Sequence, residues 1–164
     1  MKYDESLSLL EIVEAKIFRG DGVRSYDEIP PETICVNDLI VTSGRKFLAM
    51  RISGGDAAAS AMAYMAVGTV TTAATLTDTT LTGEIKRKAL STSSNTGNDN
   101  IWVAVSTFGG SADAVTSLSI VEAGIFNHAS SGLGTMFQRV TFSTVVLANS
   151  DLVKITLSTN VGSS

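Results

Sequence analysis

The stretch that decides the fold is Met62-Ala-Tyr-Met-Ala-Val-Gly-Thr-Val-Thr-Thr-Ala-Ala74. Apolar side chains occupy both faces of its first half, which ends in Gly68 and a threonine-rich segment. A short apolar run bounded by glycine and threonine is more typical of a strand inside a sheet than of a helix. Nothing in the stretch is suited to catalysis, so it predicts sheet structure and no chemistry.

Further strands are expected on both sides of this stretch. Residues 7–18 fit a helical face and a strand face, and the turn at 19–22 favours a strand. The remaining candidates are rich in apolar and β-branched residues and are separated by turn signals: 81–90, 101–108, 117–126, 136–142 and 152–157. Strands at this spacing predict a mainly β chain that folds as a β-sandwich, jelly-roll-like domain or barrel. Trp102 is expected to be buried between the sheets.

One helix is expected near residues 38–53. Asn37-Asp38 offers an N-cap, Val41, Leu48 and Ile52 follow at helical offsets, and Gly54-Gly55 ends the pattern. By contrast, residues 91–100 are too polar to pack and predict an exposed loop.

The segment 1–35 has two interpretations. It carries an apolar run, turn glycines and Pro30-Pro31, and it is either an arm that pairs with the sheet edge of a neighbour or the first hairpin of the domain. Residues 36–164 are predicted to form one β-sandwich domain. The tripeptide Arg19-Gly20-Asp21 matches an integrin-binding motif, but its surroundings favour a plain turn.

Composition and charge limit the classes of function. Charged residues make up 17% of the 164 residues, so the surface is charge-poor, which fits either a protein packed against neighbours or a Thr/Ser-rich soluble domain. The net charge of −4 argues against nucleic-acid binding. Lys86-Arg87-Lys88 is interpreted as a solvated strand face or edge guard rather than a phosphate or partner patch.

Candidate chemical groups are few. Cys35 cannot form an intrachain disulfide and is predicted to be a small core residue; the only possible partner for a nucleophilic thiol is His128, in a loop. Glu122 is interpreted as one half of an acid–base pair, as outward-facing, or as paired with Arg139 across the sheet, with the last two favoured. The remaining isolated acids are expected to cap turns: Asp56, Asp78, Asp99, Asp113 and Asp151. We therefore expect no enzyme and no catalytic, cofactor-binding or metal-ligating residues.

The first residues lack the basic start and apolar run of a signal peptide, and no apolar stretch reaches membrane-spanning length. Synthesis and folding in a cytoplasm, without membrane partners, are expected.

A set of motifs resembles small virion proteins of tailed bacteriophages. The motifs are Asn37-Asp-Leu-Ile-Val-Thr-Ser-Gly-Arg45, Met65-Ala-Val-Gly-Thr-Val-Thr-Thr-Ala73, Asp78-Thr-Thr-Leu81 with Glu84, Glu122-Ala-Gly-Ile-Phe126, Val140-Thr-Phe142 and Ile155-Thr-Leu157. They span residues 36–158, and Val70 departs from the glycine expected there. The resemblance implies a structural protein of the particle without an enzymatic step.

Within the particle, several positions stay open. A capsid decoration (cement) protein, a tail or baseplate component and a fibre base, possibly host-receptor binding, all fit the resemblance. The short globular chain lacks the repeats of a fibre shaft, which favours a cement protein that clamps neighbouring major capsid subunits. A homo-oligomer, most simply a trimer at local three-fold sites, is expected.

Overall fold

The computed structural model of the chain describes residues 11–20, 31–55, 60–95, 101–109, 113 and 117–160. These residues form ten strands and one helix. The strands are β1 (Glu11–Phe18), β2 (Glu32–Asn37), β3 (Leu39–Ile40), β4 (Tyr64–Gly68), β5 (Glu84–Ala89), β6 (Thr92–Asn95), β7 (Ile101–Gly109), β8 (Ser117–Phe126), β9 (Met136–Ala148) and β10 (Leu152–Asn160), and the helix is α1 (Thr42–Ser53).

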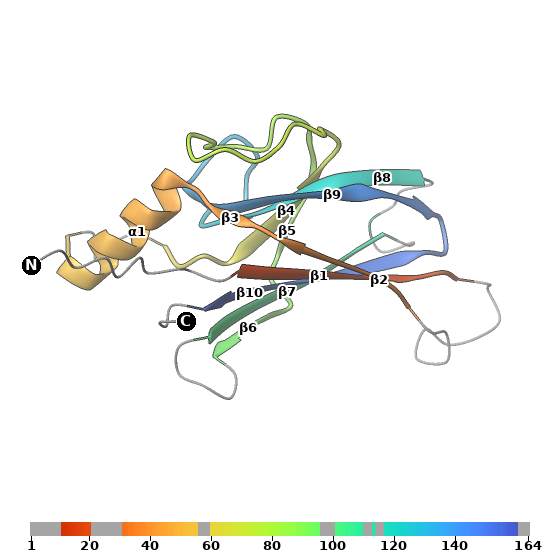
Figure 1. The fold of residues 1–164 in the computed structure, drawn as a ribbon, viewed down its shortest axis with the longest axis horizontal. Coiled ribbons are helices and arrows are strands. Elements are labelled where there is room, and N and C mark those ends of the chain that lie inside the picture. Colours follow the sequence, from red (N-terminus) through yellow and green to blue (C-terminus); the bar gives the residue numbers. More distant parts are fainter. Residues whose placement is uncertain are drawn as a thin grey trace, which may run out of the picture.

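Two five-stranded antiparallel sheets lie face to face (Figure 1). Sheet A has the strand order β2-β1-β10-β7-β6, and sheet B has the order β3-β9-β8-β4-β5. The predicted mainly β, sandwich-like fold with one helix is confirmed for the described residues. Strand β9 continues to Ala148 and β10 to Asn160, each beyond its predicted end.

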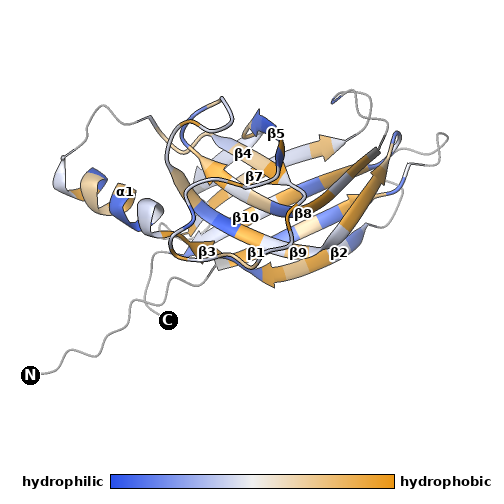
Figure 2. Cartoon of the chain, turned by 90° about the horizontal axis from the view of Figure 1, so that it is seen from above, coloured by the Kyte–Doolittle hydropathy of each residue, from blue (hydrophilic) through white to orange (hydrophobic). Residues whose placement is uncertain are grey.

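The core lies between the sheets and follows from the two-residue period of the strands. In β1, Val13, Ala15 and Ile17 are buried, and the residues between them lie on the other face. Figure 2 shows the same alternation of polar and apolar residues along other strands. Trp102 is partly buried in this core, meeting the Phe137 ring edge-on at a centroid distance of 5.6 Å. Its predicted position is confirmed, but it is not fully enclosed.

Strand β4, predicted as a sheet interior, is buried on both faces. Met65 and Val67 contribute to the core between the sheets. Ala66 belongs to a second apolar cluster with Leu81 and Phe126, on the outer face of sheet B. The threonine-rich segment after β4 covers this outer face, so the strand has no solvated side.

Residues 11–18 form a strand of the sandwich. Strand β1 lies between β2 and β10 in sheet A, with Ile12 opposite Asn37 and Glu11 opposite Thr159. The sandwich therefore includes described residues before position 36, while the assignment of segment 1–35 as an arm or a first hairpin stays a prediction. Residues 1–10 and 21–30, which hold the rest of the predicted arm and most of its turn, lie outside the described part.

The predicted start of the helix is wrong. Leu39 and Ile40 form β3, which pairs with Arg139 and Gln138 of β9, and the helix begins at Thr42 without a side-chain cap. Burial explains this, because Ile40 and Val41 are more favourably enclosed at the sandwich edge than on a helix surface. The predicted helical face is also wrong, since Ile52 is 88% exposed.

Two further expectations fail at the edges of sheet A. Residues 92–95 of the predicted loop form β6, an edge strand in which Thr92 and Ser93 are exposed while the backbone pairs with β7. Cys35 is exposed rather than buried, because Ile34 and Val36 on either side of it pack against the core. An edge strand needs only backbone pairing and one apolar face. A polar sequence therefore does not exclude an edge strand.

Candidate functional site

The most buried charged cluster lies on the outer face of sheet B, beneath residues 69–83. Arg139 on β9 contacts Glu122 on β8, with Nε and Nη2 at 2.9 and 2.8 Å from Oε2. On its other side, Nη1 lies 2.6 Å from Oδ2 of Asp78 in the covering segment. The Glu122 side chain is fully buried and that of Arg139 is 3% exposed, so these contacts are shielded from water.

The cluster fastens the threonine-rich segment to the sheet. Arg139 Nη2 donates to the carbonyl oxygen of Thr72 at 2.9 Å, and Asp78 accepts from the backbone amide of Thr75 at 2.8 Å. Glycines at two positions leave room for the side chains packed on this face of sheet B. A Cβ at Gly68 would overlap the Glu122 carboxylate, and one at Gly124 would press on Leu81.

The electrostatics favour the ionised form of Asp78. Burial disfavours the charged form of Asp78, but the Thr75 amide and Arg139 outweigh it, so the pKa of Asp78 lies below its ordinary value. The pairing of Glu122 with Arg139 across the sheet is confirmed. Asp78, which no pattern in the sequence placed near Glu122, is the second acid at this site. Its lowered pKa is what a carboxylate held in an ion pair with Arg139 should have.

A second tie holds the end of β1. Arg19 contacts Asp151 at 2.9 Å and Glu32 at 3.1 Å, and it donates to the carbonyl oxygen of Val146. Asp151 also accepts from the backbone amides of Gly20 and Ala148. Burial opposes the charge of Asp151, yet these hydrogen bonds hold the pKa of Asp151 below its usual value. The Arg19 side chain of the tripeptide is 42% exposed and is held by contacts within the chain, whereas Asp21 of the predicted turn lies outside the described residues.

A third tie involves the basic run on edge strand β5. Lys86 and Lys88 lie 3.8 and 2.9 Å from Asp113, which also accepts a hydrogen bond from the backbone amide of Gly109. Arg87 is buried against Glu84 at 2.7 Å, with its guanidinium 3.7 Å from the centroid of the Phe126 ring. The expected solvated strand face is therefore wrong for Arg87. The turn-capping role predicted for Asp78, Asp113 and Asp151 is confirmed, whereas Asp56 and Asp99 lie outside the described residues.

Cys35 and His128 are on different sheets. Cys35 lies on β2 at the edge of sheet A, and His128 follows β8 of sheet B, where its Nδ1 accepts a hydrogen bond from the Ser130 amide. Across the residues that the structure describes, no three His, Cys, Asp or Glu side chains gather as a metal site would require.

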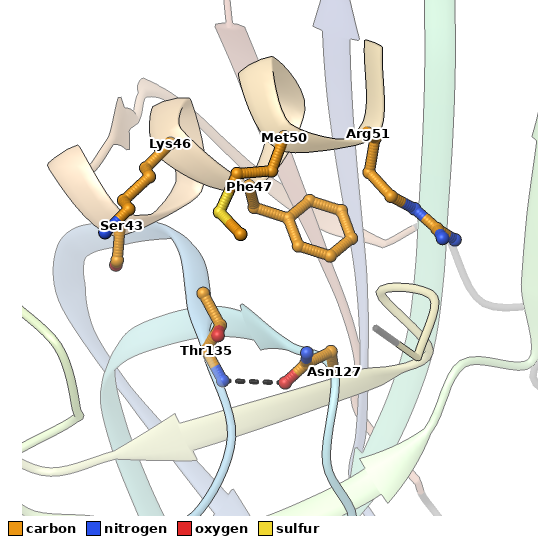
Figure 3. Close-up of a pocket in the computed structure, with 7 residues that line it drawn as sticks. All are labelled: Ser43, Lys46, Phe47, Met50, Arg51, Asn127 and Thr135. Carbon is orange, nitrogen blue, oxygen red and sulfur yellow. Dashed lines mark hydrogen bonds between the residues drawn. The ribbon is translucent and has the colours of Figure 1, made fainter. Parts of the chain in front are cut away.

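A groove beside the helix is a further candidate for a binding site, and it was not predicted from the sequence. Figure 3 shows Phe47 and Met50 directed from α1 toward the turn between β8 and β9, with Lys46 and Arg51 on either side of them. Its volume is about 420 Å³. Its lining residues are Ser43, Lys46, Phe47, Met50, Arg51, Asn127 and Thr135. The only signal in the sequence was the spacing of these residues, which places them on one side of a helix.

These observations define the described part of the chain as a two-sheet antiparallel β-sandwich with internal ionic ties and a groove beside α1. No protein-family profile, no curated protein and no solved structure matches the chain. None of the described helical residues forms a segment long and apolar enough to cross a membrane.

Proposed function

We propose that this chain is a structural protein of a bacteriophage virion, and specifically a capsid decoration protein. In this role it clamps neighbouring major capsid subunits from outside and performs no chemical step. Its own copies, joined as a trimer at local three-fold sites, are the expected assembly, and the virion is the expected location.

The observation that supports the proposal best is where the phage-like motifs meet in space. Val41 and Phe126 belong to the apolar cluster on the outer face of sheet B, as does Leu81. Asp78 and Glu122 meet at Arg139 on the same face. Motifs that lie far apart in the sequence thus form one packed unit, as expected if they specify a shared architecture rather than match by chance.

The three ionic ties fit the mechanical role of a clamp. Each tie joins segments distant in sequence: Arg139 to the segment after β4, Arg19 to the turn before β10, and Asp113 to β5. Such links raise the free energy of local opening, and a bound clamp is useful only if it stays folded when the shell is stressed. A clamp that binds only the assembled shell stabilises it by mass action.

The test compares particles with and without this chain. Particles lacking it should assemble, yet release DNA at a lower temperature or under milder osmotic shock. Hundreds of copies per particle would agree with a capsid position. A dozen copies or fewer, with normal DNA retention and failed adsorption to cells, would instead indicate a tail, baseplate or fibre-base component that binds a host receptor.

A further inference from the structure

Helix α1 is anchored to the sandwich by its first turn and by Phe47 and Leu48, which pack against the core. Gly44 is the only buried residue of the helix, and a Cβ there would overlap the carbonyl oxygen of Phe137. Ser43 Oγ donates to the carbonyl oxygen of Met136 at 2.7 Å. Beyond this turn the helix carries the half-buried Phe47 and Met50, while Ile52 is almost fully exposed. An isolated helix of this length is marginal in water, so a partner in the groove would stabilise it.

The groove is basic at its rim and apolar at its floor. Lys46 and Arg51 form no ion pair with any other described residue, and Arg51 lies 5.5 Å from the centroid of the Phe47 ring. Among the described residues none that lines the groove is acidic, although the chain as a whole carries a net charge of −4. The fitting occupant is therefore a short segment with acidic and apolar side chains.

The sequence before β1 has this chemistry. It reads Met1-Lys-Tyr-Asp-Glu-Ser-Leu-Ser-Leu-Leu10, with Asp4 and Glu5 ahead of three leucines. Strand β1 starts beside Asn37, five residues before the first residue of α1, so this segment joins the sandwich close to the end that carries the helix. Ten residues can span at most about 33–36 Å when fully extended.

We infer that the groove between α1 and the β8–β9 turn binds residues 1–10 of a second copy of this chain. Asp4 and Glu5 pair with Lys46 and Arg51, and the leucines cover Phe47 and Met50. The choice of a neighbouring copy rests on the proposed function, in which copies are joined to one another. The exchange of segments links copies through many modest contacts.

The test uses full-length variants and their oligomeric state, measured by sedimentation with helicity checked by circular dichroism. The groove variant is Lys46→Glu with Arg51→Glu, and the segment variant is Asp4→Lys with Glu5→Lys. Each alone should weaken self-association about tenfold or more, and wild-type association should weaken in high salt. Lys154→Glu, an exposed charge reversal on β10, is the control and should leave association unchanged.

Mixing the two variants decides between a neighbour and the same chain. In the mixture each reversed segment can meet a reversed groove on the other copy, so mixed oligomers should recover in part, since one contact of a mixed trimer stays mismatched. The inference is overturned if wild type is monomeric, if either variant associates as wild type does, or if mixing restores nothing. Because no particle is involved, these outcomes are independent of the shell-stability test of the proposed function.

Discussion

Replacing Arg139 with methionine tests whether the buried cluster holds the segment 69–83 on sheet B. Methionine retains much of the apolar stem but removes the guanidinium, which leaves the fully buried Glu122 with only the Val70 amide, 3.4 Å from its Oε1. Removing one partner of a buried ion pair costs about 3–5 kcal/mol. For a chain of this size, each kcal/mol lowers Tm by about 2–4 °C, so a fall of about 6–20 °C is expected.

The assay combines thermal unfolding with hydrogen exchange. In Arg139→Met, amides around Thr75 and Asp78 should lose protection more than amides of β10, because the segment loses its contacts through Asp78 and Thr72. The matched control is Lys154→Met, whose side chain is exposed on β10 and should cost at most about 0.5 kcal/mol.

A double-mutant cycle with Glu122→Gln sharpens the result. Since both substitutions remove the same pair, the combined loss should be smaller than the sum by about 0.5–3 kcal/mol. If Arg139→Met unfolds within about 1 kcal/mol of wild type, or if exchange around Thr75 is unchanged, the cluster is not what holds the segment.

Four other outcomes are expected. Folding lowers the pKa values of Asp78 and Asp151, so their contribution to stability is present above about pH 4 and is lost as the pH falls further. The denaturant midpoints of Asp78→Asn and Asp151→Asn should therefore decline less steeply in acid than the midpoint of wild type. Trp102→Ala should cost about 2–4 kcal/mol by chemical denaturation, a little under a fully buried aromatic, and red-shifted native fluorescence typical of a fully hydrated indole would contradict its placement. Gly44→Ala should lower stability by about 1–3 kcal/mol despite the higher helix propensity of alanine, because the new Cβ overlaps Phe137; an increase in Tm would count against the contact. Deleting residues 1–30 should abolish cooperative unfolding, because it removes β1 from the middle of sheet A, and a folded remainder would show that β1 is dispensable.

Elements with a strong local pattern could be predicted from the sequence. Strands β4, β7 and β8 are runs of apolar and β-branched residues. Such residues prefer a sheet, and the structure places all three runs within one, so local preference and fold agree. Strand β6 could not be predicted, since the backbone pairing of Ser93 and Ser94 with β7 leaves no trace in side-chain hydropathy. The apolar run at residues 39–41 was ambiguous for a similar reason, because burial at the sandwich edge overrode its helical spacing.

The charged clusters were only half predictable. Arg139 and Glu122 lie on the neighbouring strands β9 and β8. Once both segments were predicted to be strands, an ion pair between the two side chains was one of a few possible arrangements. Asp78 joins them from a segment whose path depends on the whole fold, and no local pattern carries that information. The exposure of Cys35 depended on which face of β2 meets the core, and the apolar neighbours Ile34 and Val36 could have indicated it.

The position of β10 has a consequence for the order of folding. In sheet A, this last strand separates the β2–β1 pair from the β7–β6 pair, so neither half of the sheet touches the other without it. All five strands of sheet B lie earlier in the chain, between residues 39 and 148. During synthesis on a ribosome, the strands of sheet B can therefore pair before β10 emerges. At that stage β1 and β7, which flank β10 in sheet A, each still have an unpaired edge. Emergence of β10 joins the two halves in one step, so the interval before β10 emerges is when their open edges are most exposed to pairing with other nascent chains.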